Sequence, residues 1–288
     1  MISERELAKE IVLLDIVESV KGKTLDIECS SPTMQFSCNL EGCCEYEKIE
    51  NSDIVIITAG FPRKPGMSRE DLLEKNKKVI EGVCDNIKKY APDSILIVVT
   101  NPLDVMAYLT LKRTGFPRER VIGMAGVLDS ARLRNFIAKE LDVNPKNVQG
   151  LVLGSHGDSM VPLPEYTTVS GIPITMLMEN EKIERIIERT RNCGAEIVNY
   201  LKTGSAYYSP ASSILEMVEA IVKDSKSVLP ASVYLNGEYG YNDIFLGVPI
   251  KLGRKGVEKI IEIKLNEKAK ELLDKSAEMT RKNIDKLK

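Results

Sequence analysis

Short runs of aliphatic residues alternate with longer amphipathic stretches in the first half of the chain. Three runs are continuously apolar, at residues 11–15, 53–58 and 95–100, and such runs are typical of strands buried on both faces of a parallel sheet. Between the last two, residues 68–90 repeat apolar side chains at helical spacing: Leu72, Leu73, Val79, Ile80, Val83 and Ile87. This order of strand, helix and strand predicts a doubly wound α/β domain.

The pattern changes after about residue 124. Helical stretches at 129–142, 180–202 and 209–223 enclose less regular strands at 147–153, 228–234, 243–250 and 257–264. A last helix is predicted to begin near Asn266, because asparagine caps helix N-termini well. We therefore expect two domains, residues 1–124 and an α+β domain of residues 125–288, with no low-complexity linker between them.

Composition narrows the class of protein. The 288 residues carry a net charge of −2, which gives no positive footprint for nucleic acid or an anionic membrane. No apolar run approaches the roughly 20 residues that span a bilayer. The six cysteines contain no C-x-x-C pair, and we interpret them as reduced thiols, neither disulfides nor metal ligands. A cytoplasmic protein without nucleic-acid, membrane or metal partners is expected.

The chain has a single histidine, His156, between two glycines in the segment GSHGDSMVP. Histidine is the side chain whose ordinary pKa lies nearest neutrality, so this imidazole is the first candidate for proton transfer. The alternative is a surface or packing histidine. Asp129 could orient such an imidazole, and Arg132, three positions further along a helix, could bind a carboxylate. The alternative for this pair is an ion pair on a helix surface.

Polar residues follow two of the predicted strands, at the edge where open α/β sheets bind ligands. Asp15 closes the first strand, and a carboxylate there can accept hydrogen bonds from a ribose diol. The next basic residue is Lys21, so little is available to neutralise a 2′-phosphate, which favours NAD over NADP. The third strand ends in Thr100, and Asn101 comes directly after it. Each of these residues is also common in ordinary turns.

The segment TAGFPRKPGMSR, residues 58–69, follows the second strand. Its glycines and prolines disfavour regular structure, and Arg63 and Arg69 place two guanidinium groups on one loop. Arginine binds carboxylates through paired hydrogen bonds, so the loop could close over an anionic ligand and exclude water. The alternative is a solvated basic surface loop.

Together, these motifs resemble the lactate/malate dehydrogenase family, and within it the lactate-dehydrogenase-like malate dehydrogenases. The likeness spans nearly the whole chain and is carried by ITAGFPRKPGMSREDL, VVTNPLDVM, VIGMAGVLDSARLR, GSHGDSMVPLP and GEYGYNDIFLGVPIKLG. It implies a Rossmann-type doubly wound parallel sheet with an α+β catalytic domain, NAD as the cofactor, malate or oxaloacetate as the dicarboxylate substrate, and a homo-oligomer, either dimer or tetramer.

The resemblance also implies roles for single residues. His156 would be the acid/base, with Asp129 holding its tautomer and stabilising the imidazolium. Arg132 would clamp the C1 carboxylate, Arg69 would polarise the substrate carbonyl, and Arg63 would bind the second carboxylate, where the lactate enzymes carry an uncharged glutamine. The residues implied to contact the cofactor are Asp15, Asn76, Val99, Thr100 and Asn101, of which Asn101 would also contact the substrate.

One feature of the family does not occur in these residues. Family members carry a strand and a G-x-G-x-x-G turn roughly 20 residues before the ribose aspartate. Only 14 residues precede Asp15, and the chain contains no G-x-G-x-x-G. That strand is central in the order 3-2-1-4-5-6, so we expect its two neighbours to be unpaired and the phosphates to lose a helix N-terminus.

This departure leaves alternatives open. A misplaced start or an incomplete sequence would leave the activity of the family intact. A truncated chain would be a non-catalytic or weakly NAD-binding relic. A third alternative keeps the mechanism and changes the substrate to another 2-hydroxy acid, although Arg63 argues against simple lactate.

Overall fold

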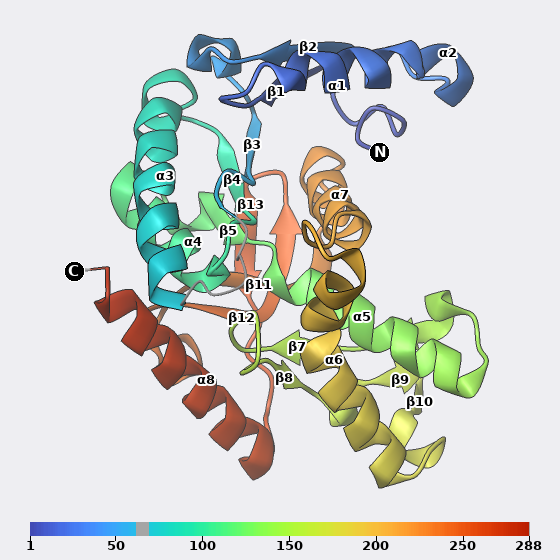
Figure 1. Cartoon of the computed structure of the whole chain (residues 1–288). Helices are drawn as coiled ribbons and strands as arrows, with labels where there is room; N and C mark the ends of the chain where they lie inside the picture. Colours follow the sequence, from blue (N-terminus) through green and yellow to red (C-terminus); the bar gives the residue numbers. More distant parts are fainter. Residues whose placement is uncertain (62–68, 288) are drawn as a thin grey trace.

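The fold is built around one six-stranded sheet, whose strands run in the order β13-β12-β11-β5-β4-β3. A computed structural model describes residues 1–61 and 69–287 (Figure 1). The strands are parallel in one half of the sheet: β3 (Ile54–Ile57), β4 (Ile95–Val98) and β5 (Val121–Gly123). They are antiparallel in the other half: β11 (Ser227–Asn236), β12 (Asn242–Gly253) and β13 (Gly256–Ile260).

Helices bury both faces of this sheet. All four residues of β4 are buried, which explains why this run is apolar without alternation. Figure 1 shows α3 (Arg69–Tyr90) and α4 (Leu103–Thr114) on one side and α7 (Tyr208–Val222) on the other. The last helix, α8 (Glu267–Asp285), packs against α4 and β12. One hydrophobic core therefore joins residues from both halves of the chain.

A second, smaller core lies beside α5 (Ala125–Leu141), which leaves the sheet at the end of β5. In this core, α5 packs against α6 (Asn180–Leu201) through apolar side chains that include Leu133, Ile137 and Ile187. Five short strands complete this part: β6 (Val148–Gln149), β7 (Val152–Leu153), β8 (Val161–Pro162), β9 (Thr168–Val169) and β10 (Ile172–Pro173). Single 3-10 turns lie at Tyr46–Ile49, Arg118–Arg120, Pro145–Asn147, Pro164–Tyr166, Ile174–Met176 and Glu238–Gly240.

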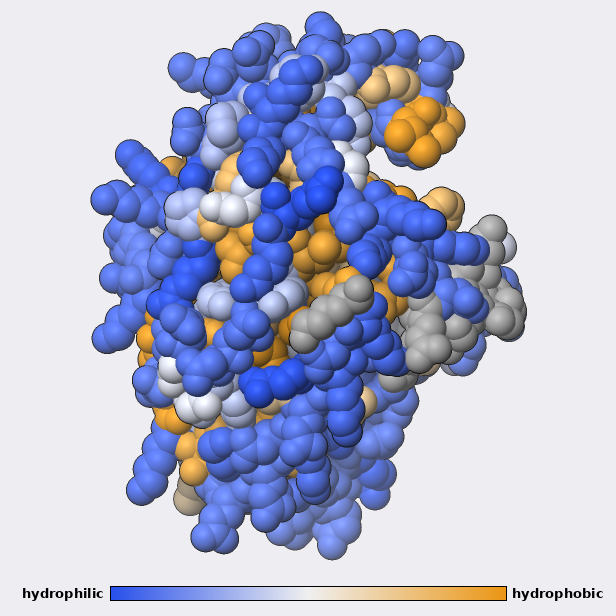
Figure 2. Space-filling model, turned by 90° about the vertical axis from the view of Figure 1, so that its left-hand side faces the viewer, coloured by the Kyte–Doolittle hydropathy of each residue, from blue (hydrophilic) through white to orange (hydrophobic). Residues whose placement is uncertain are grey.

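The N-terminal layer, residues 1–50, has a sheet of its own at the top of Figure 1. Its strand β1 (Glu10–Leu14) pairs in parallel with β2 (Asn39–Cys43), beside helices α1 (Ser19–Cys29) and α2 (Ser31–Met34). Within the described ranges β1 pairs with no other strand, and β3 pairs only with β4. Three of the four residues of β3 are partly exposed, and Figure 2 shows apolar surface in the hollow below this layer. Among the described residues, β1 and β3 thus each lack a strand partner along one edge, in line with the expectation that the neighbours of the missing strand lose their pairing.

The predicted fold class is confirmed, and most predicted elements lie within two residues of the observed ones. The strands at 11–15, 53–58 and 95–100 are β1, β3 and β4, and the helix at 68–90 is α3. Asn266 caps α8 as predicted, since its side chain accepts a hydrogen bond of 2.8 Å from the Ala269 amide. No helix in the described part of the chain is long and apolar enough to cross a membrane.

Other predictions need correction. The helix expected from residue 129 begins at Ala125. The prediction missed its first four residues because Ala125–Leu128 are all buried and so show no amphipathic spacing. Asp129 therefore lies in the second turn of α5 and does not open it. The strand expected at 147–153 is two strands in different sheets, β6 and β7. The domain boundary near residue 124 stays a prediction, because Gly123 of β5 pairs with Ser232 of β11 and the sheet continues across it.

Candidate active site

The loop that carries His156 is fixed at its start by a close backbone approach. Gly154 and Gly247 of β12 exchange two backbone hydrogen bonds, of 2.9 and 3.0 Å. Gly154 has a φ of +81°, and a Cβ there would lie 2.8 Å from Ser276 Oγ. Glycine is therefore required here for both conformation and space. These contacts fix the path of the loop after β7, so that His156 lies against Asp129 of α5.

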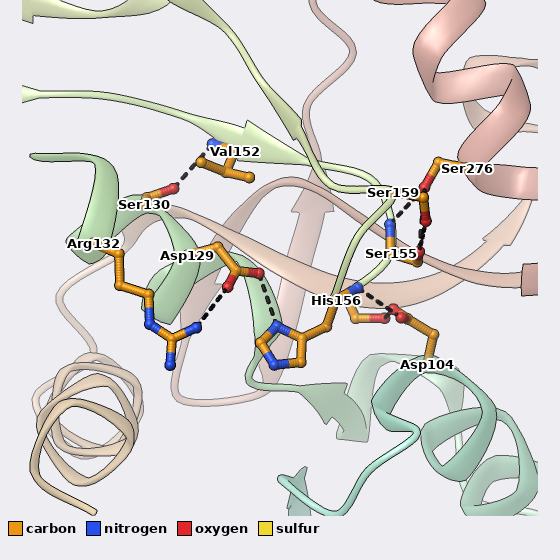
Figure 3. Close-up of polar contacts among 10 residues, drawn as sticks. Asp104, Asp129, Ser130, Arg132, Val152, Ser155, His156, Ser159 and Ser276 are labelled. Atoms are coloured by element: carbon orange, nitrogen blue, oxygen red, sulfur yellow. Dashed lines mark hydrogen bonds and ion pairs between the residues drawn. The ribbon is translucent and has the colours of Figure 1, made fainter. Parts of the chain in front are cut away.

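His156 is hydrogen-bonded to Asp129 (Figure 3). Its Nδ1 lies 2.9 Å from Asp129 Oδ2, and the two side chains are only 16% and 2% exposed. An ionised carboxylate can only accept, so Nδ1 carries the hydrogen and donates it. In the neutral imidazole Nε2 is then the free acceptor. The predicted partnership of these two residues is thus present in the geometry.

Two effects compete in setting the pKa of His156. Burial disfavours the charged imidazolium and by itself lowers the pKa. The negative charge of Asp129 and its hydrogen bond favour the imidazolium, and together they leave the pKa of His156 raised above its ordinary value. A histidine in this state can take up and release a proton near neutral pH.

Arg132 lies on the same face of α5 as Asp129. Its Nη1 is 3.6 Å from Asp129 Oδ1, an ion-pair distance longer than a hydrogen bond, and its side chain is 10% exposed. In the described ranges, Arg132 Nε and Asp129 Oδ1 are the buried side-chain polar atoms without a hydrogen-bond partner. Figure 3 shows the Asp129 carboxylate between the Arg132 guanidinium and the His156 imidazole. Unused guanidinium donors beside an imidazole fit a ligand that carries a carboxylate next to a hydroxyl.

Asp104 also belongs to this cluster, although the sequence analysis did not single it out. It accepts a hydrogen bond of 2.9 Å from the His156 backbone amide and one of 2.6 Å from the Ser232 hydroxyl. Burial raises the pKa of its carboxyl, and the two hydrogen bonds oppose that rise. The available signal was its position in VVTNPLDVM, between the buried Leu103 and Val105. A carboxylate in so apolar a turn requires buried partners.

Three serines hold the far side of the same loop and were likewise missed. The Ser155 amide donates to Ser276 Oγ of α8 over 2.8 Å, and the Ser155 and Ser159 hydroxyls lie 2.6 Å apart. Serine is frequent in every loop, so the sequence carried no signal for this contact. It ties the residue before His156 to the C-terminal helix.

The ends of β3 and β4 are held together by two buried side chains. Asn76 of α3 accepts from the Phe61 amide over 2.8 Å and donates to the Asn101 carbonyl over 2.6 Å. The Thr100 hydroxyl donates to the Ala59 carbonyl over 2.7 Å. The polar groups of Asn76 and Thr100 are therefore bonded to backbone and shape this edge of the sheet. Their predicted contact with a cofactor stays a prediction.

The other predicted cofactor residues lie close to the surface. Asp15 follows β1 directly and is exposed, and its Oδ1 accepts a long hydrogen bond of 3.4 Å from the Val17 amide. Asn101 is exposed just after β4, and the Val99 amide donates to the Ile57 carbonyl over 2.9 Å. An exposed carboxylate at one strand end and an exposed amide at another fit the ribose and nicotinamide ends of a dinucleotide. We assign no residue to its pyrophosphate.

Two predicted substrate residues are not described in atomic detail. Arg63 falls within residues 62–68, outside the described ranges, and Arg69 is described only as the first residue of α3. The roles expected for both arginines stay predictions.

Comparisons with known proteins cover nearly the whole chain. The profile described as lactate/malate dehydrogenase, NAD binding domain, matches residues 1–123, and the profile described as lactate/malate dehydrogenase, alpha/beta C-terminal domain, matches residues 126–288. A malate dehydrogenase of Chlorobium limicola is 54% identical over 99% of this chain and 93% of its own length. A malate dehydrogenase of Methanosarcina mazei is 53% identical over 96% of this chain and 91% of its own length.

Solved structures agree with these relatives. The malate dehydrogenase of Salinibacter ruber superposes with a TM-score of 0.95 at 48% identity, covering 99% of this chain and 92% of that one. A lactate dehydrogenase of Cryptosporidium parvum, solved with lactic acid and the nicotinamide cofactor, gives a TM-score of 0.96 at 39% identity, covering 99% and 92%.

Proposed function

The chain belongs to the lactate/malate dehydrogenase family, as its motifs predicted, and we propose that it interconverts (S)-malate and oxaloacetate with NAD. The observation that carries this proposal is the buried Arg132, with unused donors, beside the His156–Asp129 pair. The non-catalytic relic is not favoured, because His156, Asp129 and Arg132 lie together and the relatives named malate dehydrogenase match nearly the full chain. A dehydrogenase of another 2-hydroxy acid is likewise not favoured.

The histidine and the aspartate together move the proton. In malate oxidation, Nε2 of the neutral His156 accepts the proton of the substrate hydroxyl as the C2–O bond gains carbonyl character. Asp129 holds Nδ1–H in place and stabilises the imidazolium that forms. In the reverse direction the imidazolium returns this proton to the oxygen of oxaloacetate. NAD supplies the acceptor of the hydride that leaves C2.

The arginines orient the substrate and stabilise its charge. Arg132 binds the C1 carboxylate through its unused donors, which fixes C2 and its hydroxyl beside the imidazole. Arg69 polarises the C2 carbonyl in the transition state, and Arg63 binds the second carboxylate. Asp15, Asn76, Val99, Thr100 and Asn101 form the cofactor edge, in which Asn76 and Thr100 act by holding the backbone.

A cytoplasmic location and a homo-oligomer, either dimer or tetramer, are part of the proposal. Six free cysteines fit a reducing compartment. Exposed apolar side chains gather where α6 leads into α7, and a surface of this kind fits contact with a second copy of the chain: Tyr200, Leu201, Tyr207 and Tyr208.

The test measures NADH binding and then substrate-dependent NADH oxidation with the 288-residue chain. We expect oxaloacetate to be reduced in strong preference to pyruvate. In Arg63→Gln the ratio of kcat/KM for oxaloacetate to that for pyruvate should fall by about 100-fold, because one carboxylate loses its counter-charge. Loss of NADH binding, or NADH binding without oxaloacetate turnover, would contradict the proposed function. An equal fall with both substrates would show that Arg63 does not bind the second carboxylate.

A further inference from the structure

Asp104 is a buried carboxylate for which the proposed mechanism has no role. It lies in the first turn of α4 and is 4% exposed. Its two oxygens each receive one donor from a distant part of the chain, Oδ2 from the His156 amide and Oδ1 from the hydroxyl of Ser232 on β11. Figure 3 shows Asp104 on the side of His156 opposite to Asp129.

Three consecutive backbone amides lead up to the imidazole, and each is bound by a different element. The Gly154 amide donates to Gly247 of β12, and the Ser155 amide donates to Ser276 of α8. The His156 amide donates to Asp104 of α4. Asp104 makes the last of these contacts and is bonded to the residue that bears the ring. Loss of the Asp104 contact would free the backbone of His156 itself. The other two contacts hold only Gly154 and Ser155, the residues that precede it.

We propose that Asp104 is a positioning residue for His156: its carboxylate links the His156 amide to Ser232 of the sheet and so holds the imidazole against Asp129. This inference rests on the proposed function, because the ring it positions is the proton carrier. An uncharged acceptor could satisfy the same amide at a smaller desolvation cost. When ionised, this carboxylate also places a negative charge near the imidazole.

The charges around the imidazole support that second role. Asp129 and Arg132 face His156 from α5, and Asp104 faces it from α4. The two carboxylates favour the imidazolium and raise the pKa of His156, whereas Arg132 lowers it. Asp104 thus offsets part of the lowering of the His156 pKa by Arg132. The guanidinium of Arg132 is itself needed to bind the substrate carboxylate.

The test compares Asp104→Asn with Asp104→Ala. Asparagine keeps an oxygen acceptor for the His156 amide and a polar partner for Ser232, but removes the charge. Alanine removes both. Because His156 is the only histidine in the sequence, the untagged protein gives one imidazole signal in NMR, and its pH titration needs no turnover. Thr110→Ala is the matched control, since Thr110 is a buried residue of α4 whose hydroxyl donates to the Met106 carbonyl and also bonds the Cys84 thiol of α3.

We expect Asp104→Asn to lower the pKa of His156 while kcat stays within a few-fold of the unmodified chain. Asp104→Ala should lower the pKa as well and reduce kcat by about tenfold or more, because the ring is no longer held. The KM for NADH should change little in either variant. Thr110→Ala should reduce thermal stability and leave the pKa of His156 in place.

An unchanged pKa of His156 in Asp104→Asn would overturn the inference, even if the alanine variant failed to fold. The same holds if Thr110→Ala moves the pKa equally, since general loosening would then explain the effect. These results are distinct from failure of the proposed function, which would appear as an unmodified chain that binds no NADH or does not reduce oxaloacetate.

Discussion

The His156 cluster and the N-terminal layer differ in how completely they are held. In the cluster, Asp129 and Asp104 are buried and His156 is mostly buried, and separate hydrogen bonds fix the backbone and ring of His156. In the N-terminal layer, four of the five residues of β1 are partly exposed, and β1 pairs only with β2 among the described residues. Contacts within the chain therefore fix the geometry of the cluster, whereas the layer that carries Asp15 is held by fewer contacts.

This difference separates proton chemistry from cofactor binding. Changes in the cluster should affect turnover and its pH dependence while leaving NADH binding in place. Changes in the layer should affect stability locally and cofactor affinity, with little effect on His156.

The largest effect is expected for His156→Asn. Asparagine cannot accept the substrate proton, so kcat should fall by about 1,000-fold while NADH still binds. Steady-state kinetics measure kcat, and a fluorescence titration with NADH measures cofactor binding separately. Undiminished turnover would exclude His156 as the proton carrier.

Asp129→Asn should have the next largest effect, about 100-fold on kcat, because the tautomer and the imidazolium both lose support. The variant should also show a lower pKa of His156, since the charge and hydrogen bond of Asp129 raise it. Malate oxidation needs the neutral imidazole and is lost as pH falls through this pKa. Oxaloacetate reduction needs the imidazolium and is lost as pH rises through it.

Both limbs should therefore move to lower pH in Asp129→Asn, measured as kcat/KM against pH in each direction. Limbs that stay in place would show that Asp129 does not set the titration. Ser130→Ala is a control on the same helix, since the Ser130 hydroxyl accepts from the Val152 amide, and the change should leave both limbs unchanged.

The smallest effects concern stability in the two regions. Leu96→Ala in β4 removes a side chain with no exposed surface and should lower the free energy of unfolding by about 3 kcal/mol. Val12→Ala in β1 removes a partly exposed side chain and should cost about 1 kcal/mol or less. Urea denaturation of both variants measures the difference. Equal losses would mean that the N-terminal layer is as tightly held as the central sheet.

The sequence predicted the parallel strands, the long helices and the candidate site because each has a strong local signal. Apolar runs mark β3 and β4, and helical spacing marks α3. The sequence did not reveal residues whose role depends on several elements meeting around them. Asp104 is a site residue only because α4, β11 and the His156 loop meet, and this meeting is a property of the tertiary fold. Likewise, α5 begins four residues before its amphipathic part, because its first turn is buried on all sides.

The most direct test of the account is the pH dependence of kcat/KM for malate and for oxaloacetate, set beside the NMR titration of His156 in the same protein. We predict that malate oxidation rises and oxaloacetate reduction falls through one shared pKa. This pKa should lie above the ordinary value of 6.5 and match that of the imidazole. Two profiles that change in the same direction, or at a pKa that the imidazole does not share, would contradict a mechanism in which His156 carries the proton.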